Sequence, residues 1–226
     1  MGKKEHAHKS IDPASLALIE KAAQEGRELA WDRFKKQEPQ CGFGLLGICC
    51  RNCNMGPCRI DPFGNGPDRG ICGADADTIV ARNLLRTIAA GAAAHSDHGR
   101  DIVETLLHAA TGEKSDYAIK DEAKLMALAG ELGVPTEGRS SKEIAADIAR
   151  MAMAEFGSEK GAFEFMRRVP PPRKALWDSL NITPRGIDRE VVEAMHRTHM
   201  GVDTDYVNII LQGLRTGLSD GWGGSM

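Results

Sequence analysis

The chain is organised around the stretch CGFGLLGICCRNCNMGPCRIDPFGNGPDRGIC, residues 41–72. This stretch holds all six cysteines of the 226 residues, together with seven glycines and three prolines. It shows neither a helical nor a strand period. A loop of this length without secondary structure is unusual, unless something other than a hydrophobic core fixes its shape. The stretch therefore predicts an irregular segment folded around an inorganic group.

Three kinds of cysteine chemistry compete for this segment. Disulfides need an oxidising compartment, and the charged N-terminus lacks the apolar run of an export signal. Zinc modules usually bring two CxxC pairs, whereas here the only such pair is Cys50 and Cys53. An iron–sulfur cluster takes four thiolates, often from close spacings plus one remote cysteine. The last pattern fits best, and its four candidate ligands are Cys50, Cys53, Cys58 and Cys72.

Two cysteines remain, Cys41 and Cys49. Because Cys49 and Cys50 are adjacent, their side chains are expected to diverge and to serve different sites. Cys41 is then the natural companion of Cys49. Two thiolates hold half of a four-iron cluster, and a two-fold axis would bring the same pair from a second copy of the chain. The spacing thus suggests one cluster within each subunit and one shared across a homodimer, unless Cys41 and Cys49 are simply buried thiols.

The rest of the chain predicts an all-α fold. A helix is expected from Pro13, behind the N-cap Asp12, to Lys36. A second should run from Asp75 to Gly112, and no strand is expected anywhere. Residues 1–11 are expected to form a flexible tail before one helical cluster-binding domain, 12–226. The further expected helices cover about 121–132, 141–156, 159–168, 174–180, 188–199 and 204–218.

Composition excludes several classes of function. The net charge is −3, from 29 basic and 32 acidic residues, which argues against a nucleic-acid partner. Aromatic residues make up 5%, too few for base-stacking platforms. No apolar run reaches the length of a membrane span. We therefore expect a cytoplasmic protein without a membrane span.

Several runs resemble the N-terminal part of the nickel-containing, anaerobic carbon monoxide dehydrogenases, from about residue 12 to the end of the chain. The resemblance implies a homodimer that oxidises CO with water to CO2, two protons and two electrons. It also implies that Cys50, Cys53, Cys58 and Cys72 hold a subunit [4Fe-4S] cluster, while Cys41 and Cys49 hold half of a shared one. The matching runs are residues 41–64, 69–74 (RGICGA), 89–100 (AAGAAAHSDHGR), 200–205 (MGVDTD) and 213–225 (GLRTGLSDGWGGS).

The same resemblance implies a proton path lined by histidines at helical spacing, for which His95 and His98 match the first two positions. Asp101 and Glu104 stand where further histidines would follow, which puts that path in doubt. Without the resemblance, lone histidines on a helix favour surface or capping roles. The remaining candidates, His108, His196 and His199, are interpreted as structural.

The family's chains are much longer, and no cysteine follows Cys72. We therefore expect a chain truncated before the domains that bind the nickel–iron–sulfur cluster, and no CO oxidation by this chain alone. The implied partners are a second copy, a ferredoxin-like electron acceptor and acetyl-CoA synthase. Two alternatives remain: a zinc-stabilised helical interaction domain, and a hybrid-cluster protein, against which the vicinal Cys49–Cys50 pair argues.

Overall fold

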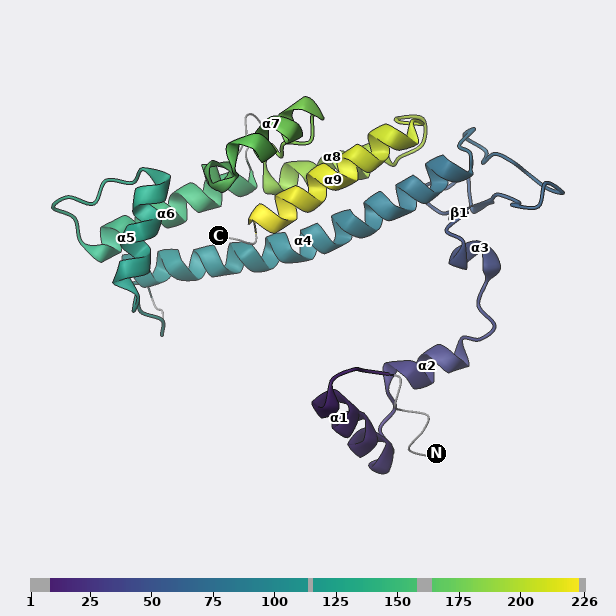
Figure 1. Ribbon diagram of the computed structural model, residues 1–226, viewed down its shortest axis with the longest axis horizontal. Coiled ribbons are helices and arrows are strands. Elements are labelled where there is room, and N and C mark those ends of the chain that lie inside the picture. Colours follow the sequence, from purple (N-terminus) through teal and green to yellow (C-terminus); the bar gives the residue numbers. More distant parts are fainter. Residues whose placement is uncertain (1–8, 114–115, 158–163, 224–226) are drawn as a thin grey trace. The chain divides into compact units, whose positions relative to one another are not determined.

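A computed structural model describes residues 9–113, 116–157 and 164–223 (Figure 1). Contacts divide the chain into two compact units, Met1–Leu46 and Gly47–Met226. Residues 1–8 of the expected tail lie outside the described residues. In the described parts, no helix has both the length and the apolar character needed to cross a bilayer.

The first unit contains three helices, α1 (Pro13–Gln24), α2 (Ala30–Lys36) and α3 (Gly42–Leu45). As expected, Asp12 caps α1, and its carboxylate accepts a hydrogen bond from the Ser15 amide at 2.8 Å. The prediction of one continuous helix to Lys36 is wrong. Gly26 adopts a φ of +66°, a left-handed conformation that follows many helix ends, and the chain leaves the helix there.

The second unit is built along α4 (Ala76–Thr111). Asp75 caps its N-terminus by accepting from the Thr78 amide at 2.9 Å, and Gly112, at φ +78°, ends it, as predicted. Figure 1 shows α9 lying along α4. The two helices approach closely because α9 carries Gly213, where a β-carbon would stand only 3.2 Å from Ile88 Cδ1.

The remaining elements confirm the all-α prediction, with one local exception after α4. Residues 164–168, expected to be α-helical, form a 3₁₀ helix, and residues 159–163 lie outside the described residues. A capping box begins α6: Ser140 Oγ accepts a hydrogen bond from the Glu143 amide, and the Glu143 carboxylate accepts one from the Ser140 amide. The elements after α4 are α5 (Glu122–Leu132), α6 (Ser141–Phe156), η1 (Glu164–Arg168), α7 (Pro171–Ser179), α8 (Ile187–Arg197) and α9 (Tyr206–Gly223).

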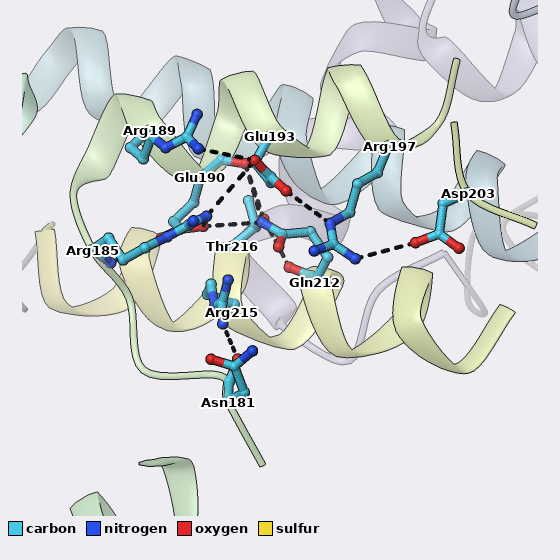
Figure 2. Close-up of polar contacts among 10 residues, drawn as sticks. All are labelled: Asn181, Arg185, Arg189, Glu190, Glu193, Arg197, Asp203, Gln212, Arg215 and Thr216. Carbon is cyan, nitrogen blue, oxygen red and sulfur yellow. Dashed lines mark hydrogen bonds and ion pairs between the residues drawn. The ribbon is translucent and has the colours of Figure 1, made fainter. Parts of the chain in front are cut away.

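A polar network occupies the interface between α8 and α9 (Figure 2). Its centre is Glu190, which is completely buried. The carboxylate accepts hydrogen bonds from the Arg185 amide and guanidinium at 2.8–3.0 Å and from Gln212 Nε2 at 3.0 Å. Burial by itself would raise the pKa of Glu190, but these bonds outweigh it and hold the pKa below its usual value. The interface is therefore fixed by an ionised, fully bonded carboxylate.

Glu155, near the C-terminal end of α6, is also a buried carboxyl, but its pKa is raised and not lowered. It is 6% exposed and accepts one hydrogen bond, from the Glu164 amide at 2.8 Å. Burial is the main cause that raises the pKa of Glu155 to about 7, and the nearby Glu164 charge adds to it, against the lowering effect of that amide. The folded state therefore binds a proton that the unfolded state releases between pH 4.5 and pH 7.

Replacing this carboxyl, as Glu155→Gln, is expected to stabilise the protein above pH 7 by about 3 kcal/mol and to change its stability little at pH 4. The wild type should lose stability as pH rises from about 4.5 to 7, because the buried group must then ionise. Urea unfolding at pH 4 and pH 8 measures both effects. The control is Glu104→Gln, an exposed carboxyl on α4. Equal pH dependence in wild type and Glu155→Gln would contradict this prediction.

Candidate functional site: a cavity lined by four cysteines

A short antiparallel ladder sets the geometry of the cysteine stretch. Cys50 in β1 (Cys49–Cys50) pairs with Cys58 in β2 (Cys58–Arg59). The sequence predicted no strand here, so that prediction is wrong over these four residues. The extended backbone arises because the tight turn through Gly56 brings the two segments side by side. A β-carbon at Gly56 would lie 3.0 Å from both Cys50 O and Cys58 N.

The ladder places neighbouring cysteines on opposite sides. Successive side chains of a strand point to opposite faces, so Cys49 and Cys50 diverge. Cys50 lines a cavity and is buried, whereas Cys49 is half-buried and is not among the residues that line that cavity. Asn83 of α4 anchors this segment by donating to Gly47 O at 2.8 Å and to Cys49 O at 3.1 Å.

The cavity unites the four cysteines singled out in the sequence. It is narrow, because a water-sized sphere finds only about 10 Å³ of room in it. Among the described residues, no three His, Cys, Asp or Glu side chains form a group that could hold a single metal ion. The four thiols thus surround a space instead of meeting at a point. The lining cysteines are Cys50, Cys53, Cys58 and Cys72.

The loop that precedes α4 wraps one side of this cavity. The Ile71 amide donates a hydrogen bond to Cys58 Sγ at 3.4 Å. The backbone of Gly70 lies against the same cysteine, since a β-carbon there would be in van der Waals contact with Cys58 Sγ at 3.5 Å. The loop is closed by a hydrogen bond from the Gly70 amide to Ala74 O at 2.8 Å. The bond from Ile71 directs a backbone N–H group toward sulfur, which favours a thiolate ligand.

Cys72 sits beside a buried guanidinium. Arg82 of α4 is 1% exposed, and its Nη1 donates to Cys72 Sγ at 3.7 Å. Burial alone would raise the pKa of Cys72. Hydrogen bonding with the Ala74 backbone and with Arg82, together with the charge of Arg82, outweighs burial and holds the pKa below the usual thiol value. Sequence reasoning missed Arg82, although its place ten residues after Cys72, on a helix that begins beside it, was a usable signal.

Two buried nitrogen atoms at the cavity wall have no hydrogen-bond partner within the part of the chain that the structure describes. These are Asn52 Nδ2 and Arg82 Nε, and both residues line the cavity. Buried donors are normally satisfied, so such atoms indicate a missing acceptor. The cavity therefore combines four soft sulfur donors with unsatisfied donor groups, the surroundings expected for an anionic metal–sulfur group.

The other predicted site residues lie elsewhere. Cys41 is exposed and belongs to the first unit, whereas Cys49 belongs to the second. No disulfide joins any of the six cysteines, all of which the structure describes. His95 and His98 are exposed on α4, and His95 Nδ1 lies 2.8 Å from Asp220 Oδ1 of α9.

The other three histidines among the described residues are also exposed. His196 and His199 lie at the end of α8, and His108 Nε2 lies 3.7 Å from Glu113 Oε2. Nothing in their surroundings assigns them a chemical role. Their interpretation as structural residues stays a prediction.

Residues 48–226 match the model of the Prismane/CO dehydrogenase family. The chain belongs to this family. The matched region includes the four-cysteine cavity and begins after Cys41.

Named relatives of the family agree with this assignment. Carbon monoxide dehydrogenase 1 of Methanosarcina mazei is 63% identical over 218 residues, which are 96% of this chain and 35% of that protein. The chain thus spans about a third of the length of the curated relatives it matches.

Solved structures of the family share the fold. The as-isolated, nickel-free carbon monoxide dehydrogenase from Thermococcus sp. AM4 superposes with a TM-score of 0.89 at 54% identity, over 96% of this chain and 34% of that one. An acetyl-CoA synthase/carbon monoxide dehydrogenase, described with NiZn[Fe4S4] and NiNi[Fe4S4] clusters in its alpha subunits, superposes with a TM-score of 0.87 at 40% identity. It covers 99% of this chain and 33% of that one.

Proposed function

We propose that this chain is the cluster-binding, electron-transferring region of a nickel-containing carbon monoxide dehydrogenase. The observation that carries the proposal is the cavity lined by Cys50, Cys53, Cys58 and Cys72, with unsatisfied N–H donors at its wall. These four thiolates would hold a [4Fe-4S] cluster, which when bound accepts and passes on single electrons. The reaction of the whole protein would be CO + H2O → CO2 + 2 H⁺ + 2 e⁻.

The second thiol pair extends this proposal to a dimer. Cys41 and Cys49 would hold half of a cluster shared with a second copy of the chain, and that cluster would be the electron exit toward a ferredoxin-like acceptor. The opposite directions of the Cys49 and Cys50 side chains support the assignment of these two residues to different clusters. The likeness to an acetyl-CoA synthase/carbon monoxide dehydrogenase supports acetyl-CoA synthase as a further partner. No residue of this chain is assigned to the nickel-containing cluster.

The proposal also includes a proton path along α4. His95 and His98 stand on the exposed side of the helix, followed by the exposed carboxyls of Asp101 and Glu104. Carboxylates can relay protons, so the departure from a histidine series does not by itself break the path. The contact between His95 and Asp220 also fits a simple structural role, in which it ties α9 to α4.

Anaerobic reconstitution of the chain with iron and sulfide tests the cluster assignment. We expect a brown protein with about six iron atoms per chain, four from the private site and two from half of the shared one. Sedimentation should show a dimer. Cys41→Ala should lower the iron content to about four per chain. A colourless protein that binds zinc and no sulfide would instead support the zinc-stabilised interaction domain.

A further inference from the structure

Arg82 is a buried cation whose hydrogen-bond acceptors include no carboxylate. Its guanidinium is buried against the four-cysteine cavity, and its hydrogen bonds go to Cys72 Sγ and to Asp203 O, the latter at 2.7 Å. Neither acceptor is a carboxylate. A buried cation without a counter-ion destabilises the folded protein. The four cysteines that share the cavity wall with Arg82 are therefore the groups placed to supply a compensating negative charge.

We propose that Arg82 is the fixed counter-cation of the group held by the four cysteines and that it raises the reduction potential of that group. The inference rests on the proposed function, because it needs a redox-active cluster in the cavity. Four thiolates make such a cluster anionic, and reduction adds a further negative charge. A cation held against one ligand sulfur therefore stabilises the reduced form more than the oxidised form.

Contacts with the segment around Asp203 also hold the guanidinium of Arg82 in place. Its Nη2 is bound to the backbone of Asp203, and the carboxylate of Asp203 is bound to Arg197 Nη1 at 3.1 Å. Thr78 Oγ1 donates to Thr204 O at 3.0 Å, which ties the same segment to α4. Arg82 therefore cannot swing toward solvent, and its charge acts on the cavity from one fixed direction.

The chain provides a matched control on the same helix. Arg86 lies one turn further along α4, and its Nε donates to Thr198 Oγ1 at 3.0 Å. Arg86 does not line the cavity. Replacing Arg86 removes an arginine of α4 that binds Thr198, just after α8, but removes no charge from the cavity wall.

The test compares Arg82→Gln, Arg82→Lys and Arg86→Gln, all carrying Cys41→Ala so that only the four-cysteine site holds a complete cluster. Each chain is reconstituted anaerobically, its iron and sulfide are counted, and the reduced cluster is followed by EPR during a redox titration. At the potential where the parent is half reduced, Arg82→Gln should show a reduced-to-oxidised ratio about tenfold lower. For a one-electron couple this corresponds to about 59 mV. Arg82→Lys and Arg86→Gln should stay within about threefold of the parent.

The outcomes separate this inference from the proposed function. If the parent itself takes up no iron and sulfide, the proposed function fails and the inference falls with it. If Arg82→Gln holds a full cluster at the parent's potential, only the role of Arg82 is overturned. The role is also overturned if Arg82→Lys shifts as far as Arg82→Gln, or if both lose the cluster while keeping their helical circular dichroism, because shape and not charge would then be decisive.

Discussion

Replacing Arg185 with methionine is expected to lower the free energy of unfolding of the Gly47–Met226 unit by about 3–5 kcal/mol. The reason is the carboxylate of Glu190, which is fully buried and depends on Arg185 for three hydrogen bonds. The hydrogen bond from the backbone amide of residue 185 remains after the substitution. Both hydrogen bonds from the guanidinium, and its positive charge, are lost. Urea unfolding followed by circular dichroism measures the change.

The pH dependence of this effect has a defined sign. In the wild type the pKa of Glu190 is lowered, so its contribution to stability is present above about pH 4.5 and is lost as pH falls through the lowered value. In Arg185→Met the isolated carboxyl prefers to be protonated, so the deficit should shrink toward pH 4. Arg189→Met is the control, since Arg189 pairs with Glu193 at 3.2 Å in a more exposed position. It should cost less than about 1 kcal/mol. Equal losses in the two variants would refute the assignment.

Replacing Gly56 with alanine is expected to lower iron uptake by the four-cysteine site at least about tenfold. The added β-carbon would meet two backbone atoms, Cys50 O and Cys58 N, each at 3.0 Å. Backbone atoms of a paired ladder cannot rotate away as a side chain can. The hydrogen-bonded pairing of the two strands must therefore break, and the side chains of Cys50 and Cys58 no longer face the same cavity. Iron and sulfide analysis after anaerobic reconstitution measures the loss.

A second glycine serves as the control for this prediction. Gly91 lies within α4, and a β-carbon there would meet nothing within 4 Å. Gly91→Ala should leave iron uptake unchanged and raise stability by about 0.5–1 kcal/mol, because alanine loses less backbone freedom in a helix. Full iron content in Gly56→Ala would show that the ladder is not needed to hold the cysteines together.

Local signals in the sequence were sufficient for much of the fold. The limits of α4 follow from Asp75 and Gly112, because capping and helix termination depend on residues within one turn. The cysteine spacing alone grouped the four residues that line the cavity and separated Cys49 from Cys50. Local reasoning failed at Gly26, where one left-handed glycine ends α1, and over Cys49–Arg59, where pairing of two short segments outweighs the absence of a strand period.

By itself, the sequence determined the limits of α4 and the grouping of the four cysteines that line the cavity, since both depend on spacing along the chain. Only the tertiary structure decided what surrounds those thiols. Arg82 meets the backbone of Asp203, 121 residues away, and Glu190 meets Gln212 across two helices. Such contacts depend on how α4, α8 and α9 pack, and burial then turns ordinary charged side chains into fixed ions that need a specific partner.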